Sequence, residues 1–117
     1  MSLKTKLAMA LVVLCIGGSS TVFGQGSSGD RQVTYLEVMA DGSLLVEAEG
    51  GWENPDGCAH PSRIFVPSSN PFLDRYYAAI LAAYTSGNDV WAWVAGCQQM
   101  AWGEEYPIVK NVATRRR

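Results

Sequence analysis

Residues 70–97 constrain the fold more than any other part of the chain, because they predict a helix followed directly by a strand. Apolar residues recur every three to four positions after Asn70, which is typical of a helix with one apolar face. Asn70 can cap such a helix, and Gly87 suits the left-handed conformation that often ends one. The Val-Trp-Ala-Trp-Val run that follows is rich in strand-forming residues. We therefore predict a helix over residues 70–86 and a strand over residues 88–97.

The first 24 residues have the organisation of a secretory signal peptide. Two lysines precede an apolar run that is too short to span a bilayer comfortably, and small residues follow it. Cys15 lies inside the apolar run, which argues against lipidation at that cysteine. We expect cleavage between Gly24 and Gln25, a secreted or periplasmic location, and no membrane span once the signal is removed.

Residues 25–117 would then form the mature protein, about 93 residues that keep seven of the nine basic side chains and all eleven acidic ones, for a net charge of −4. We divide it into a flexible Gly/Ser-rich lead-in over residues 25–30, a single domain over residues 31–114 and a basic tail over residues 115–117. Because an acidic body repels nucleic-acid phosphates, we expect no nucleic-acid partner.

Cys58 and Cys97 are the cysteines that remain after signal removal. An even pair in an exported chain predicts a disulfide, and a loop of roughly 40 residues closed in this way stabilises a domain by about 4 kcal/mol. The rival interpretation is a metal site, but two cysteines and the distant His60 lack the paired spacing of zinc ligands. The sequence also carries no nucleophile–base or phosphate-loop motif, so we expect no metal, no cofactor and no enzymatic activity.

The other segments are strand-like and give the order β-β-β-α-β-β, with the helix between the third and fourth strands. Asp41-Gly42 predicts a hairpin turn between the first two strands. Five short strands and one helix favour a mainly β, OB-fold-like five-stranded barrel, which hides strand edges; the alternative is an open α+β sheet. The predicted strands span residues 32–39, 43–49, 58–66, 88–97 and 108–113.

Several short motifs carry a family resemblance. They are Cys58-Ala59, Pro71-Phe-Leu-Asp-Arg-Tyr, Ala82-Ala-Tyr-Thr-Ser-Gly87, Val90-Trp-Ala-Trp-Val94, and Tyr106-Pro107 with Asn111. From about Ser43 to Thr114 the chain resembles the B subunit of the subtilase cytotoxin family and exported bacterial proteins similar to it. The resemblance implies an OB-fold that assembles as a pentameric ring, binds sialylated glycans and acts with a separate catalytic A subunit.

The strand over residues 88–97 carries the first two candidate binding residues. Strand alternation places Val90, Ala92 and Val94 on one face and Trp91 and Trp93 on the other. The small residues suit the narrow interior of a barrel, so we expect both indoles outside, where an exposed pair indicates a binding surface or a subunit interface. The alternative is that the indoles fill the core.

Trp52 and Trp102 fall in predicted loops that are rich in carboxylates and carboxamides, Glu104 among them. An indole face with such partners offers a sugar both a stacking platform and hydrogen bonds; the alternative is that each loop tryptophan caps one end of the barrel. We therefore predict an exported module that binds a glycan or glycoconjugate, as a homo-oligomeric ring. Its predicted ligand-binding residues are Trp52, Trp91, Trp93, Trp102 and Glu104. The alternative is a secreted or periplasmic protein-interaction or inhibitor domain.

Overall fold

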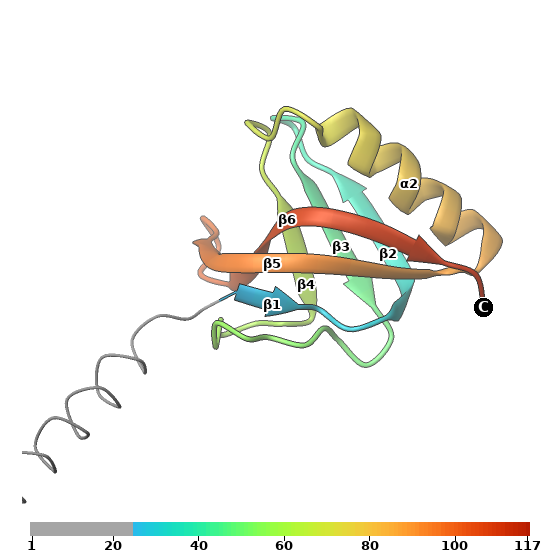
Figure 1. The fold of residues 1–117 in the computed structure, drawn as a ribbon. Helices are drawn as coiled ribbons and strands as arrows, with labels where there is room; N and C mark the ends of the chain where they lie inside the picture. Colours follow the sequence, from blue (N-terminus) through green and yellow to red (C-terminus); the bar gives the residue numbers. More distant parts are fainter. Residues whose placement is uncertain (1–24) are drawn as a thin grey trace, which may run out of the picture.

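The computed structural model describes residues 25–117, so the predicted signal peptide and the Gly24 side of its cleavage site lie outside the described residues. The described chain is mainly β (Figure 1). Its elements are β1 (Gln25–Ser27), β2 (Arg31–Val38), β3 (Leu44–Ala48), β4 (Arg63–Val66), α2 (Leu73–Ser86), β5 (Asp89–Gln99) and β6 (Glu105–Arg115). Within this part of the chain, no helix is long and apolar enough to cross a membrane.

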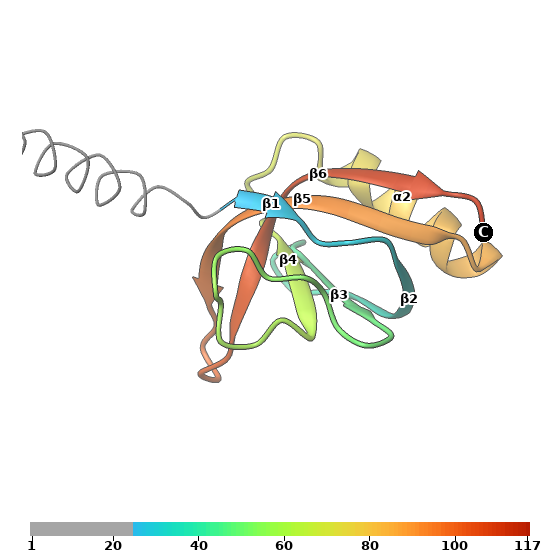
Figure 2. The same ribbon diagram turned by 60° about the horizontal axis from the view of Figure 1, so that its bottom comes forward.

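The strands pair in a closed circuit. β5 pairs with β2, β2 with β3, β3 with β4 and β4 with β6, and β6 returns to β5. The β4–β6 pair is parallel and the other pairs are antiparallel, while β1 adds to the outer edge of β5. Figure 1 shows β5 and β6 crossing in front of β2, β3 and β4, with the short β1 alongside β5. β5 and β6 bend together where their register shifts, between Trp93 and Cys97 (Figure 2).

The core lies inside this circuit and under the helix. Val90, Ala92 and Val94 of β5 are fully buried in it, so the alternate side chains of that strand point outward. Ile80 and Ala83 bring α2 onto the same core. The core is therefore built from small branched residues on the strands and from one face of the helix.

The helix begins three residues later than predicted. Asn70 does not cap it directly: the Asn70 side-chain oxygen accepts a hydrogen bond from the Phe72 backbone N–H at 2.8 Å, in a turn that precedes Leu73. The C-terminal end is as predicted, because Gly87 takes the left-handed conformation with a φ of 75° and its N–H bonds to the Ala83 carbonyl. The Tyr76 hydroxyl donates to the Lys110 carbonyl at 2.9 Å, which ties α2 to β6.

The sheet has six strands rather than the predicted five, because residues 25–27 form β1 within the segment expected to be a flexible lead-in. The helix consequently follows the fourth strand instead of lying between the third and fourth. Two hydrogen bonds of the buried Ser28 explain why this segment is held against β5. The Ser28 N–H donates to the Ala92 carbonyl at 2.8 Å, and the Ser28 Oγ accepts from the Ala92 N–H at 2.9 Å. A Gly/Ser composition does not reveal such long-range pairing.

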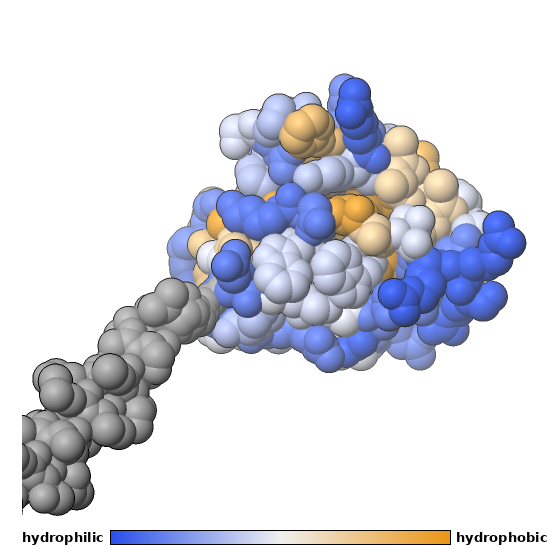
Figure 3. All heavy atoms as spheres, viewed as in Figure 1, coloured by the Kyte–Doolittle hydropathy of each residue, from blue (hydrophilic) through white to orange (hydrophobic). Residues whose placement is uncertain are grey.

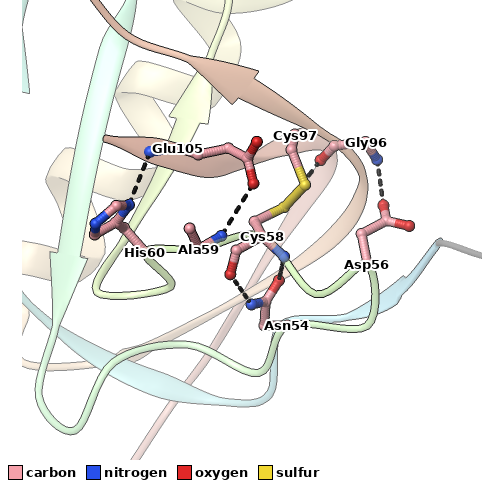
Figure 4. Close-up of a disulfide and its surroundings, with 8 residues drawn as sticks. All are labelled: Asn54, Asp56, Cys58, Ala59, His60, Gly96, Cys97 and Glu105. Atoms are coloured by element: carbon pink, nitrogen blue, oxygen red, sulfur yellow. Dashed lines mark hydrogen bonds between the residues drawn. A yellow bond between two sulfur atoms is a disulfide. The ribbon is translucent and has the colours of Figure 1, made fainter. Parts of the chain in front are cut away.

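The disulfide between Cys58 and Cys97 is confirmed, with a Cα–Cα distance of 5.6 Å. It fastens the loop between β3 and β4 to β5, beside Gly96 (Figure 4). Asn54 holds the same loop by hydrogen bonds to both backbone groups of Cys58, and Asp56 accepts from the Gly96 N–H. Because this loop reaches as far as residue 62, β4 is shorter than predicted and begins at Arg63.

Candidate functional site

Trp91 and Trp93 stand side by side on the outer side of β5. Their ring centroids are 6.1 Å apart, and 37% of the Trp93 surface is exposed. Both indoles point outward because the alternate residues of the strand fill the core. In Figure 3, pale side chains of intermediate hydropathy gather over β5 and β6, beside strongly hydrophilic groups at the C-terminal end.

The neighbouring strands leave Trp93 exposed and Trp91 half-buried. Ala113 of β6 lies opposite Trp91, and its methyl group is too small to cover an indole. Asn111 of β6 and Ser27 of β1 lie opposite Trp93 on either side, and directly paired residues share one face of a sheet. We call the surface formed by Ser27, Trp91, Trp93, Asn111 and Ala113 the indole face. It combines aromatic rings with amide and hydroxyl groups.

A hollow of about 270 Å³ lies at the Trp91 end of the indole face. Arg31 pairs with Val90, so Asp30, one residue earlier, lies across from Trp91 on the side away from Ala113. Arg115 Nη1 approaches one carboxylate oxygen of Asp30, Oδ2, at 3.2 Å, whereas the other oxygen, Oδ1, is buried and has no hydrogen-bond partner. The residues that line the hollow are Asp30, Trp91, Ala113, Thr114 and Arg115.

Trp102 lies elsewhere, on the loop between β5 and β6, with 50% of its surface exposed. Its indole N–H donates to Glu104 Oε1 at 3.1 Å and to the Tyr106 hydroxyl at 3.2 Å, and the Tyr106 hydroxyl in turn donates to Glu104. The donated hydrogen bonds, first that of Tyr106, hold the pKa of Glu104 below its ordinary value. Burial, and then the bond to Glu104, raises the pKa of Tyr106. Glu104 therefore has its hydrogen-bond partners nearby in the chain, Trp102 in the same loop and Tyr106 at the start of β6.

This loop packs on a second, smaller apolar cluster. Leu45 and Phe65 point away from the main core on β3 and β4. Met100 from the β5–β6 loop and Tyr106 from the start of β6 pack against them, with Met39 alongside. All but Met39 are buried. We call this cluster the covered face, because the chain covers its own sheet here.

Trp52 is in the core rather than on a binding surface. Only 5% of its surface is exposed, and its indole N–H donates to the Val46 carbonyl at 3.0 Å. Of the five predicted ligand-binding residues, the structure brings Trp91 to Trp93 and Trp102 to Glu104. These two pairs lie at opposite ends of β5.

Sequence reasoning missed Asp30 and Arg115, because it assigned the first to a flexible lead-in and the second to a frayed tail. β6 in fact continues through Arg115, and Arg117 is also ion-paired, to Asp89 at 2.7 Å. The alternation of Asn111 and Ala113 with inward residues would have placed Arg115 beside the indoles had the strand been extended.

One group of potential metal ligands lies close together in the described residues, but its chemistry does not suit a metal ion. Ligand atoms of Cys58, Cys97 and Glu105 lie within 4.8 Å of one another, but the two sulfurs are bonded to each other and offer no thiolate. The Glu105 carboxylate already accepts a hydrogen bond from the Ala59 N–H at 3.0 Å.

No family model matches the chain, and no curated protein or solved structure matches it either.

Proposed function

We propose that this protein is a non-enzymatic exported module that binds a glycan or glycoconjugate through the indole face. The observation that carries the proposal is the pair of outward indoles on a strand whose other side is core. Indole rings stack on the C–H face of a sugar, and Asn111 and Ser27 lie where they can bond its hydroxyls. An aromatic ring such as Trp93 that stays exposed on the outer side of the sheet adds little to the stability of a monomer, which favours a role in binding.

We also infer that the strand circuit is an OB-fold-like barrel. The circuit of five strands, the parallel β4–β6 pair and the helix between β4 and β5 all support this assignment. It agrees with the resemblance to subtilase cytotoxin B subunits, from which the homo-oligomeric ring and the separate A subunit come as proposals. The disulfide is compatible with a secreted or periplasmic location.

A glycan array probed with the mature chain tests this function. The parent should bind a defined set of glycans, and Trp91→Ala with Trp93→Ala should abolish or strongly weaken that binding, because each lost stacking contact costs about 0.5–1.5 kcal/mol. Trp102→Ala is the matched control, since it removes an exposed indole at the other end of β5. A parent that binds no glycan, or a double variant that binds as the parent does, would contradict the proposal.

The second candidate is a protein-interaction domain. Three side chains next to the covered face, Tyr35, Glu47 and Arg63, favour it. Arg63 lies over the Tyr35 ring at 5.0 Å and pairs with Glu47 at 3.2 Å. Exposed Trp, Tyr and Arg side chains are the types that dominate protein interfaces. Light scattering separates the two candidates at the indole face: conversion of an oligomer into monomers by the double tryptophan variant would assign that face to self-association.

A further inference from the structure

We propose that the hollow beside Trp91 binds one uncharged sugar ring of the glycan, with Asp30 as the specificity-determining acceptor of its hydroxyl hydrogen bonds. This inference rests on the proposed function and names the ligand class of the same surface. It draws on three features of the hollow: its size and walls, the unsatisfied carboxylate oxygen, and the charges around it.

The size and walls of the hollow suit a single sugar ring. Its volume of about 270 Å³ lies just below the range of roughly 300–1,000 Å³ typical of sites for drug-sized ligands. Trp91 supplies an aromatic wall for the C–H face of a sugar, and Asp30 supplies a hydrogen-bond acceptor across from it. The hollow is also continuous with the indole face through Trp91, so a longer glycan could occupy both.

One oxygen of the Asp30 carboxylate lacks a hydrogen-bond donor. Among residues 25–117, Asp30 Oδ1 is the one buried side-chain oxygen or nitrogen that has no hydrogen-bond partner. A buried polar atom without a partner costs free energy, which a ligand hydroxyl would recover. Arg115 contacts the other oxygen, Oδ2, its side chain is 71% exposed, and such surface ion pairs contribute little stability. The pair therefore leaves the Asp30 carboxylate free to turn and present Oδ1 to a ligand hydroxyl in the hollow.

The surrounding charges select an uncharged ligand. Arg115 already pairs with the Asp30 carboxylate, and the Arg31 guanidinium donates to the Asp30 carbonyl at 3.0 Å. A charged ligand would have to displace one partner of the Asp30–Arg115 pair, since an ammonium would replace Arg115 and a carboxylate would replace Asp30. A neutral hydroxyl satisfies the acceptor without either penalty. The hollow therefore favours neutral sugars over amino sugars with a free amine and over acidic sugars.

The test is an array that carries neutral and sialylated oligosaccharides, probed with the parent chain, Asp30→Ala and Arg115→Ala. Both variants break the same ion pair, but only Asp30→Ala removes the acceptor. We expect the parent to bind neutral oligosaccharides, Asp30→Ala to weaken that binding roughly tenfold or more, and Arg115→Ala to bind at least as tightly as the parent. Melting temperatures close to that of the parent would show that both variants are folded.

The outcomes separate the two levels of the proposal. Binding to sialylated oligosaccharides alone, or neutral binding that Asp30→Ala leaves unchanged, would overturn the assignment of the hollow and leave the glycan-binding function standing. Equal losses in Asp30→Ala and Arg115→Ala would assign both residues to the ion pair and likewise overturn it. A parent that binds neither class would overturn both the assignment of the hollow and the proposed function.

Discussion

The covered face and the indole face both carry apolar or aromatic side chains that point away from the main core of a small domain. The chain packs over the first set and leaves the second partly exposed to solvent. Leu45 and Phe65 are buried because Met100 and Tyr106 pack over them. Trp93, in contrast, lies on a part of the sheet over which the chain places no such cover and is 37% exposed.

The difference identifies the surface that has room for a ligand. An OB-fold commonly binds its ligands on the face of its second and third strands, next to the loops that flank them. Under the OB-fold-like assignment that we propose, that position corresponds to the covered face, where Phe65 and Tyr106 occupy the space themselves. The open aromatic surface lies instead on β5 and β6, where it adjoins the hollow at Asp30. A binding site is therefore expected on the second surface rather than on the first.

The sharpest test of this contrast compares the stability cost of removing one aromatic ring from each face. Phe65→Ala should lower the free energy of unfolding by about 3–5 kcal/mol, because it leaves a cavity beneath the loop. Trp93→Ala should cost less than about 1 kcal/mol, since that ring lies outside the core and 37% of its surface is exposed. Denaturant titrations of both variants measure the two values. Equal costs would show that the indole face is structural and would remove the contrast.

Loss of the disulfide should destabilise mainly the part of the domain that carries the covered face. Replacing Cys58 and Cys97 with alanine should lower stability by about 2–5 kcal/mol, because the cross-link closes a loop with a sequence separation of 39 residues. Hydrogen exchange should show the largest loss of protection in residues 51–62 and in the β5–β6 loop that Cys97 anchors. Peptide mapping by mass spectrometry without reductant verifies the bond in the parent. A uniform loss of protection that includes Trp91 and Trp93 would mean that the two faces are not independent.

Local patterns in the sequence were sufficient for the elements that depend on neighbours along the chain. The Asp41-Gly42 turn forms, the helix ends at Gly87, and the outward position of Trp91 and Trp93 follows from strand alternation. These features depend on residue spacing, which a single sequence contains.

Features that depend on distant partners could not be predicted in the same way. β1 exists because Ser28 pairs with Ala92, which lies 64 positions further along the chain. Trp52 is buried because the Val46 carbonyl is available to its indole N–H, although its surrounding sequence has the composition of a loop. The hollow joins Asp30 to Arg115, from opposite ends of the described chain. Of the candidate site, only the two indoles could therefore be predicted from the sequence, whereas Asp30 and Arg115 could not.

The smallest expected effect concerns the carboxylate that closes the covered face. The pKa of Glu104 is lowered in the folded protein, so the unfolded chain binds its proton more tightly. The resulting stabilisation is present above about pH 4.3, the value for an unperturbed glutamate, and is lost as the pH falls through the lower folded value. The melting temperature of the parent should exceed that of Glu104→Gln at neutral pH, and the difference should shrink below about pH 4. A difference that stays constant with pH would contradict this linkage.

The strand that carries the ion pair of the hollow ends only two residues before Arg117, which has a practical consequence for anyone who produces this protein. An affinity tag or fluorescent fusion joined after Arg117 would begin next to the Asp30–Arg115 pair and could obstruct the hollow. A tag joined ahead of Gln25 would emerge at the other end of β5, where Gln25 pairs with Ala95 (Figure 1). Immobilising the protein through its C-terminus could therefore give a false negative in a binding screen, whereas attachment through the N-terminus leaves the indoles facing the solution.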